Sequence, residues 1–292
     1  MQRRFATLDV FTARPFAGNP LAVVLDADGL DPSAMQQIAR EFNLSETVFV
    51  LPPVKPGHRA RLRIFTPARE LPFAGHPTVG TAVLLSGRDG GAEARALVLE
   101  EEIGPVTCEV TPAVGGGHAS FVLPVLPVEA GMPPEDDALA DALGLVPGDI
   151  GFDGFVPSAW SAGVSFIFVP VKSRDAVRRA RLMQTAALGD KAVYVFSSET
   201  VDPTHNLHAR LLAPHLGVAE DPATGAAAAA FVGVAARFGG LADGNHSFTI
   251  EQGYEMGRPS LIRLQMTLLH GKPAAASIGG EAVTVMQGTI EA

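Results

Sequence analysis

The chain has 292 residues, of which 47% are hydrophobic and 18% charged, and its formal net charge is −9. This length fits two domains better than one, and the composition supports a large buried core and excludes a disordered or fibrous chain. The negative charge argues against a nucleic-acid backbone or an anionic membrane as the main partner, while a small anionic substrate stays compatible with it.

Cysteine and histidine usage gives no sign of a metal site. Cys108 is the single cysteine, so no intramolecular disulfide can form, and the chain has no CxxC or HExxH motif. His205, His208 and His215 show no convincing ligand spacing to acidic residues. We find no signal peptide and no apolar run long enough to cross a bilayer, so we expect a cytoplasmic protein without a metal.

The first part of the chain predicts short strands and one helix. Asp31 is a good helix cap, Pro32 fits the first helical position, and apolar residues from Met35 to Phe42 recur on one helical face. Glu46 therefore follows a helix and opens a strand. The strand-like runs are residues 6–12, 20–25, 46–51 and 61–66.

The rest of the chain is also rich in strands. Residues 92–127 read as strands broken by the loop TPAVGGGH, and the Pro-rich, acidic stretch 123–137 is the best candidate for a linker. Short helices are predicted at 136–143 and, with a basic face, at 173–182. Further strands are expected at residues 164–171, 192–196, 208–213, 248–252, 261–269 and 282–287. We therefore predict a mixed, mostly antiparallel α+β fold.

A short internal repeat indicates two halves of similar build. HPTVGTA (76–82) and DPATGAA (221–227) share proline, glycine and alanine in register, and each leads into a small, apolar, helix-prone run. Two ordinary helix starts would also explain this match. Under the repeat reading, each half has a central apolar helix wrapped by a sheet.

The same motifs indicate a carboxylate site. We predict that Asp221 caps one helix with Pro222 at its first position, and that His76 and Pro77 occupy the matching places. Helix N-termini offer free N–H groups and a positive dipole end, so two such ends facing one cleft would bind a carboxylate. A plain cap for Asp221 and a structural role for His76 remain open alternatives.

Longer motifs resemble the PhzF (phenazine biosynthesis) family of isomerases, which has the diaminopimelate-epimerase-like fold. They are DVFTARPFAGNPLAVVLDADGL, IAREFNLSETVFV, RIFTPARELPFAGHPTVGTA, AEDPATGAAAAAFVGVAARF and IEQGYEMGRPSLI. The resemblance implies α+β architecture in two pseudo-symmetric lobes, each a mostly antiparallel sheet round a central helix. We place these lobes at residues 1–125, completed by a C-terminal strand at 277–292, and at 126–276.

The resemblance also implies a reaction, a cofactor-free proton shift on a small carboxylate such as trans-2,3-dihydro-3-hydroxyanthranilate. The family's acid/base glutamate matches Glu46, and its pocket histidine and aspartate match His76 and Asp221. A homodimer is expected as well. The residues expected to bind substrate are Gly75, Gly225, Ala226, Ser45 and Asn19.

Two details limit the reaction. True epimerases of this fold use two thiols, and a chain with one cysteine cannot. Ala226 stands where the phenazine enzyme has a serine, so a hydroxyl contact to the substrate is lost. A lyase or epimerase acting on another small amino or hydroxy acid, and a non-catalytic carboxylate-binding protein, remain alternatives.

Overall fold

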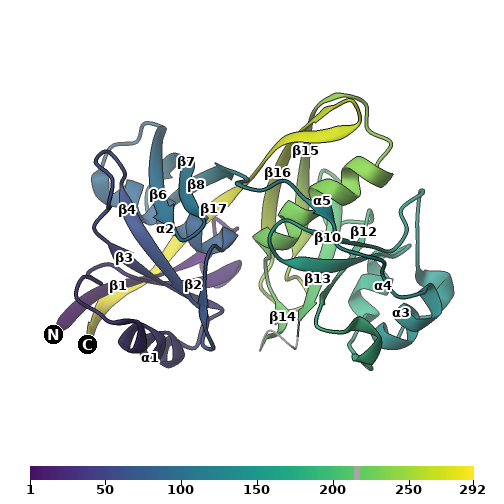
Figure 1. Ribbon diagram of the computed structural model, residues 1–292, viewed down its shortest axis with the longest axis horizontal. Coiled ribbons are helices and arrows are strands. Elements are labelled where there is room, and N and C mark those ends of the chain that lie inside the picture. Colours follow the sequence, from purple (N-terminus) through teal and green to yellow (C-terminus); the bar gives the residue numbers. More distant parts are fainter. Residues whose placement is uncertain (214–217) are drawn as a thin grey trace. The chain divides into compact units, whose positions relative to one another are not determined.

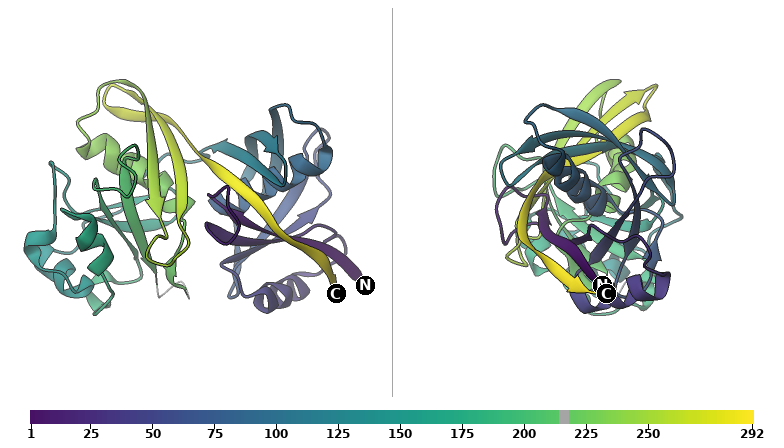
Figure 2. Two further views of the ribbon diagram at one scale, coloured as in Figure 1. Left: turned by 180° about the vertical axis from the view of Figure 1, so that it is seen from behind. Right: turned by 90° about the vertical axis from the view of Figure 1, so that its left-hand side faces the viewer.

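The computed structural model describes residues 1–213 and 218–292, and these form two compact units. Unit 1 comprises Met1–Pro124 and Gly279–Ala292, and unit 2 comprises Val125–Ile278. The last strand, β17 (Lys272–Glu291), begins in unit 2 and ends in unit 1. Within unit 1 it pairs with the first strand, so the two chain ends lie side by side (Figures 1 and 2).

Unit 1 is a strand-rich body with two helices. Besides β17, its elements are β1 (Gln2–Val10), β2 (Asn19–Val24), α1 (Pro32–Phe42), β3 (Glu46–Leu51), β4 (Ala60–Phe65), β5 (Glu70–Leu71), α2 (Gly75–Asp89), β6 (Arg95–Glu101), β7 (Gly104–Ala113) and β8 (Gly116–Val122). Antiparallel pairs join β1 to β2, β3 to β4, β6 to β7 and β7 to β8, while β2–β3 and β4–β6 are parallel. A helix connects each parallel pair, as a crossover between parallel strands requires.

Unit 2 has the same succession of pairings. Its elements are β9 (Val128–Glu129), α3 (Asp136–Leu143), η1 (Pro147–Asp149), β10 (Ser158–Ser161), β11 (Ser165–Pro170), α4 (Arg174–Arg179), η2 (Ala186–Leu188), β12 (Ala192–Ser197), β13 (Leu207–Ala213), β14 (Val218–Asp221), α5 (Gly225–Phe238), β15 (Gly244–Gln252) and β16 (Ser260–Leu269). The pairs β11–β12 and β13–β15 are parallel, and β10–β11, β12–β13 and β15–β16 are antiparallel. Helices α4 and α5 make the two crossovers, so each unit is a mixed α+β body.

Helices α2 and α5 are the buried helices of their units. In α2 every residue from Gly75 to Ser86 is buried, and α5 is nearly as enclosed. Glycine allows this close packing. A Cβ on Gly80 would lie 2.7 Å from side-chain carbons of Val10 and Leu21, and one on Gly233 would lie 2.1 Å from the Trp160 ring. The absence of a side chain at these two positions lets neighbouring elements approach the helices closely.

The predicted first helix is confirmed in detail. Asp31 is the N-cap of α1 and its carboxylate accepts a hydrogen bond from the Ala34 N–H, while Pro32 occupies the first turn. Met35 and Ala39 are buried, and Phe42 packs beside them on the same cluster. The helix ends at Asn43, whose left-handed backbone (φ 50°) turns the chain into β3. Glu46 is the first residue of that strand.

Two expectations about the strands were wrong. The stretch TPAVGGGH is not a loop, because β7 runs to Ala113, β8 starts at Gly116, and only Val114 and Gly115 form the turn. The glycines supply the positive φ angles that a tight hairpin needs. The short strands β10 and β14 were missed, since runs of four residues carry too little alternation to be recognised.

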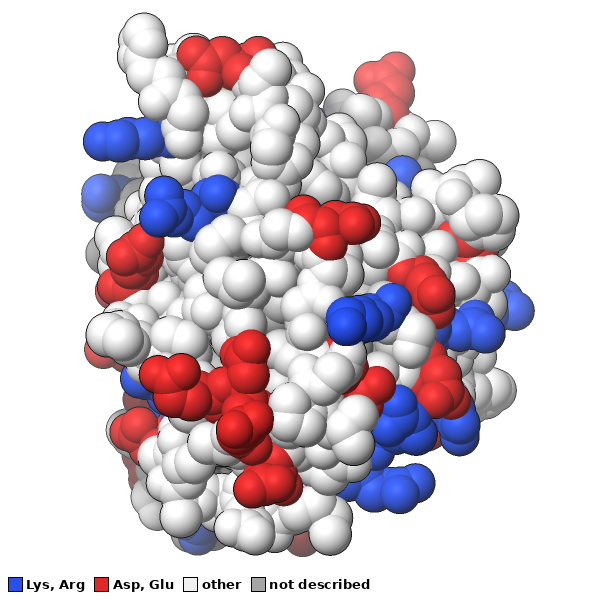
Figure 3. Space-filling model, turned by 90° about the vertical axis from the view of Figure 1, so that its right-hand side faces the viewer, with Lys and Arg blue, Asp and Glu red and all other residues white. Residues whose placement is uncertain are grey.

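Acidic neighbours neutralise positive charges of the predicted basic helix, which is α4. Arg178 and Arg179 both pair with Asp175 on α4, and Arg179 also pairs with Asp149. Figure 3 shows acidic and basic side chains interspersed on one face of the molecule. No helix among residues 1–213 and 218–292 is long and apolar enough to cross a membrane.

Candidate functional site

Glu46 and His76 are brought together in unit 1. Glu46 opens β3, and His76 is the second residue of α2. The Nε2 atom of His76 lies 3.3 Å from Oε2 of Glu46, and their side chains are only 6% and 17% exposed. The two groups therefore lie close together in a site largely closed to water.

The imidazole of His76 is held in its neutral form. Burial lowers its pKa to about 3, although a hydrogen bond to the backbone of Pro20 opposes this effect. A proline has no N–H, so the ring must donate to the Pro20 carbonyl. With Nε2 facing Glu46, the donor is Nδ1–H, and Nε2 presents a lone pair to the carboxyl group.

This tautomer defines what Glu46 can do. A lone pair on Nε2 and a carboxylate would repel each other at 3.3 Å, whereas a protonated carboxyl can donate to Nε2. A proton delivered to Glu46 therefore has an acceptor waiting for it.

The other predicted residues of unit 1 lie beside this pair in the chain. Ser45 immediately precedes β3 and is half-buried, and Gly75 is the first, buried residue of α2. Asn19 is fully buried at the start of β2, next to the Pro20 carbonyl that holds His76. The parallel pairing of β2 with β3 puts Leu21 opposite Glu46. The first residues of β2 and the first residue of β3 are thus adjacent.

Neither α2 nor α5 has a side-chain cap within the described residues. Their N-caps are Ala74 and Thr224, and neither side chain accepts a hydrogen bond from the helix. The first N–H groups of a helix have no partner within it, so an anion can be bound there. In α2 these donors belong to Gly75 and His76, because Pro77 has none.

The predicted cap at Asp221 was wrong. Asp221 ends β14, and α5 begins four residues later at Gly225, so Pro222 is not the first helical residue. The half-buried Asp221 carboxylate instead accepts a hydrogen bond from the Thr224 hydroxyl, and its carbonyl accepts from the amide of Gln252. These bonds tie the turn to β15.

The two motifs of the internal repeat therefore have to be aligned on the observed helix starts, which differs from the predicted alignment. His76 and Pro77 are not at a cap position either, because they lie inside the first turn of α2. Aligned on their helix starts, Gly75 corresponds to Gly225, and His76 corresponds to Ala226. Ala226 is half-buried in the first turn of α5 and carries no polar group.

Asp221 has a second polar neighbour that the sequence did not indicate. The hydroxyl of Tyr194 is fully buried and has no hydrogen-bond partner among the described residues. Burial, with a smaller contribution from the charge of Asp221, raises its pKa far above the ordinary range. Tyr194 therefore stays a neutral donor at any physiological pH.

A repeated loop in both units was also missed. Val54–His58 (VKPGH) and Val201–His205 (VDPTH) have valine, proline and histidine at matching places. In unit 1, Glu100 accepts hydrogen bonds from the N–H groups of Val54 and Lys55 and contacts Nδ1 of His58. Glu251 in unit 2 repeats this pattern with Val201, Asp202 and His205. A search for V-x-P-x-H would have found it.

His205 and His208 therefore have a structural role. Glu251 also contacts Nδ1 of His208, whose Nε2 lies 2.9 Å from Glu255. Burial opposes the charge on Glu251, yet these bonds outweigh burial and lower its pKa to about 2. His215 lies outside the described residues. Within the described part of the chain, no group of three His, Cys, Asp or Glu side chains could hold a metal ion.

Cys108 is an unreactive core residue. It is buried in β7, and burial, with the nearby charges of Glu101 and Glu109, raises the pKa of its thiol well above the ordinary range. A thiolate is the reactive form, so this residue is not a catalytic base.

Comparison with known proteins identifies relatives along the whole chain. Residues 8–288 match the family model described as phenazine biosynthesis-like protein. An uncharacterized isomerase of Mesorhizobium japonicum is 49% identical, with 99% of this chain and 98% of that protein covered. The trans-2,3-dihydro-3-hydroxyanthranilate isomerase of Pseudomonas fluorescens is 35% identical, with 98% of each covered.

A solved structure agrees with the fold. The PhzF-family protein of Bacillus anthracis has a TM-score of 0.89 and 26% identity, with 100% of both chains covered. The expected resemblance to this family and the expected mixed α+β fold are thereby confirmed. The chain belongs to the phenazine biosynthesis-like (PhzF) family and is an isomerase of that family.

Proposed function

We propose that this isomerase moves a proton between carbons of a small carboxylate substrate, with Glu46 as the acid/base and no cofactor. The observation that supports this most directly is the 3.3 Å approach of His76 Nε2 to Glu46 Oε2 in a buried setting. The ionised carboxylate would take a proton from a substrate C–H bond as the double bond shifts. The same proton would return at another carbon, so atoms and electrons balance without a redox partner.

His76 is proposed to hold Glu46 between the two transfers. Its neutral ring cannot compete as a general acid, since its pKa is about 3. It can accept a hydrogen bond from protonated Glu46 and thereby keep the carboxyl group aimed at the substrate. One positioned acid/base group typically accelerates a reaction by about 10²–10⁴-fold.

The N–H groups of Gly75 and His76 are proposed to bind the substrate carboxylate. Both belong to the uncapped first turn of α2, and the positive end of the helix dipole favours a negative charge there. We propose the same kind of contact for Gly225 and Ala226 in α5, with Asp221 accepting from a polar substrate group. Asn19 and Ser45 are proposed as substrate-binding residues at the edge of β2 and β3.

The substrate proposed first is trans-2,3-dihydro-3-hydroxyanthranilate, on which a 35% identical relative is named to act. The test is incubation in D₂O followed by NMR. We expect deuterium incorporation together with isomerisation in the wild-type protein, and neither in Glu46→Gln. Glu41→Gln, an exposed position on α1, is the matched control and should behave as wild type.

The result would separate the assignment of the base from that of the substrate. Full exchange activity in Glu46→Gln would show that Glu46 is not the base. Absence of exchange in the wild type would exclude this substrate. Ala226 bears on the second outcome, because a methyl group cannot make the hydrogen bond that a serine hydroxyl would. Loss of water or inversion of a centre would identify a lyase or an epimerase instead.

A further inference from the structure

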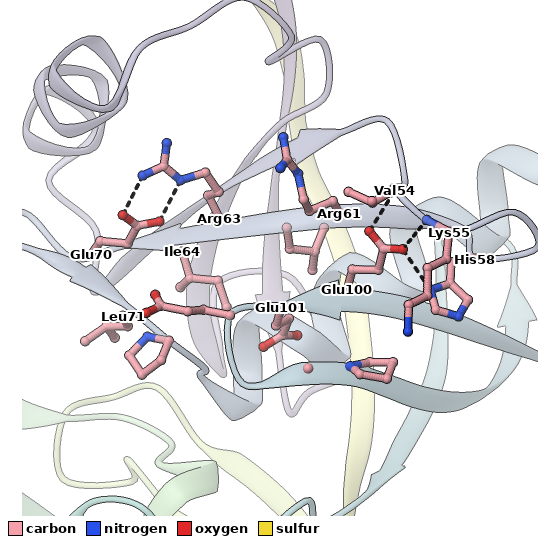
Figure 4. Close-up of a pocket in the computed structure, with 15 residues that line it drawn as sticks. Val54, Lys55, His58, Arg61, Arg63, Ile64, Glu70, Leu71, Glu100 and Glu101 are labelled. Carbon is pink, nitrogen blue, oxygen red and sulfur yellow. Dashed lines mark hydrogen bonds and ion pairs between the residues drawn. The ribbon is translucent and has the colours of Figure 1, made fainter.

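Unit 1 contains a cavity that is separate from the Glu46–His76 pair. β4 pairs with β6 at Ala60 and Arg61, and with β5 only from Ile64 onward. The strand edge between these two pairings borders a cavity of about 530 Å³ (Figure 4). Pockets for small ligands are typically about 300–1,000 Å³. Neither Glu46 nor His76 lines this one.

Four of the ionisable side chains that line this cavity form two pairs. Arg63 forms a two-pronged pair with Glu70 at one end, and His58 contacts Glu100 at the other. Figure 4 shows Glu101 between these two pairs. Glu101 belongs to the end of β6, and 8% of its surface is exposed.

One oxygen of Glu101 has no partner. Its Oε1 lies 2.7 Å from the Thr78 hydroxyl, but Oε2 is buried and makes no hydrogen bond within the described residues. The Thr78 hydroxyl also lies 2.8 Å from the Ala74 carbonyl. A hydroxyl has one proton, so Thr78 can donate to Ala74 or to Oε1 of Glu101 but not to both at once, and neither arrangement supplies a donor to Oε2. Oε2 is then a buried acceptor without a donor, on a residue that lines the cavity.

The lining of the same cavity also includes the positively charged side chain of Lys55. Lys55 lines it, and its ammonium group makes no hydrogen bond or ion pair with any described residue. The backbone N–H of Lys55 is held by Glu100, which fixes the loop that carries the side chain. The cavity lining thus has one unsatisfied acceptor and two positively charged side chains, Lys55 and Arg61, for which no ion pair is seen among the described residues. The Arg61 guanidinium points away from Glu101 (Figure 4).

We propose that this cavity binds a small amino acid, whose ammonium group donates to Oε2 of Glu101 and whose carboxylate pairs with Lys55. A buried acceptor without a donor is destabilising, and an ammonium group removes that cost while adding a charge-assisted bond. A plain carboxylate would leave Oε2 unsatisfied, and a plain amine would leave Lys55 unpaired. A zwitterion satisfies both.

Proton release is a second expected sign of this binding mode. Burial raises the pKa of Glu101 to about 8, against a smaller opposing effect from the Thr78 hydroxyl. At pH 7 the empty site is therefore mostly protonated. An adjacent ammonium group favours the ionised form, so binding expels close to one proton per amino acid.

The test is titration calorimetry at pH 7 in two buffers with different ionisation enthalpies. The probes are glycine, β-alanine and 4-aminobutyrate, compared with butylamine and butyrate. We expect at least one amino acid to bind about tenfold more tightly than both single-charge probes, with release of about one proton. Failure of all three amino acids to bind would overturn the proposal, as would equal binding of butyrate.

Substitutions in the cavity test where the amino acid binds. Glu101→Gln should weaken amino-acid binding about tenfold and abolish proton release, and Lys55→Met should lower the affinity to that of butylamine. Arg61→Met is the matched control, because the Arg61 guanidinium points away from Glu101 (Figure 4). Glu46→Gln should bind as wild type. Loss of binding in Glu46→Gln with retention in Glu101→Gln would place the ligand in the candidate active site and refute the proposal.

Discussion

The imidazole of His76 contacts Glu46 through Nε2 while its other nitrogen donates to the carbonyl of Pro20. The strand that carries Pro20 is parallel to the strand that Glu46 opens. One backbone carbonyl therefore determines which nitrogen of the ring the carboxyl group meets. The contact made by Glu46, the proposed acid/base group, thus depends on Pro20, for which no catalytic role is proposed.

Replacing Glu46 by glutamine should remove turnover with little effect on folding. Gln keeps the shape of the side chain but cannot take a proton from the substrate as a carboxylate can, so we expect turnover to fall by roughly 10²–10⁴-fold. The measurement is the rate of substrate deuteration in D₂O, with Glu41→Gln as the control. A loss of less than threefold would be inconsistent with a catalytic role for Glu46.

His76 should remain neutral from pH 5 to pH 9. Its pKa in the folded protein is about 3, against 6.5 for the free side chain. The unfolded chain binds the extra proton, so this residue's contribution to stability is complete above pH 6.5 and is lost as the pH falls toward 3. Nitrogen NMR of the ring should show the Nδ1–H tautomer without titration in that range. An imidazolium signal near pH 6 would contradict the assignment.

The contribution of Glu101 to stability should change with pH in the direction opposite to that of His76. Its pKa is about 8 in the folded protein and 4.5 unfolded, so the folded state holds the proton more tightly. Stability is fully present below pH 4.5 and falls as the pH rises toward 8, by up to about 1.4 kcal/mol per pH unit. Urea unfolding at several pH values should show a flatter profile for Glu101→Gln between pH 5 and 8. An unchanged slope would mean that Glu101 is ionised in the folded protein.

Two glycines of α2 should respond oppositely to alanine. A Cβ at Gly80 would lie 2.7 Å from both Val10 and Leu21, so Gly80→Ala should destabilise unit 1 by about 1–3 kcal/mol. Gly87 in the same helix meets nothing within 4 Å, so Gly87→Ala should stabilise by up to about 1 kcal/mol. Urea midpoints measure both. Equal effects would show that helix propensity, not packing, decides at Gly80.

Predictions from the sequence were most accurate where a single local rule determines the structure. The Asp31 cap and the apolar face of α1 follow from residues within one helix, and both are confirmed. Asp221 was misplaced because the same local rule suggested a cap, while the bond from Gln252, 31 positions away, holds the turn in another form. Such a contact leaves no periodic signal in the chain.

The candidate site shows the same limit. Glu46 and His76 were singled out by motif, but their mutual approach depends on the pairing of β2 with β3 and on the Pro20 carbonyl. The buried state of Glu101 was not predicted either, since an acidic run at a strand end normally faces solvent. The V-x-P-x-H loops were readable in the sequence, and only the short length of the match concealed them.

The path of β17 has a consequence for biosynthesis. Its second half pairs with β1 from Val10 back to Gln2, yet it leaves the ribosome only after all of unit 2. The first strand must therefore wait without this partner while residues 11–281, including all of unit 2, are translated, whereas unit 2 has nearly all of its chain available earlier. Ribosome-stalled chains that end before Gly279 should protect unit 2 from protease and leave β1 open to cleavage.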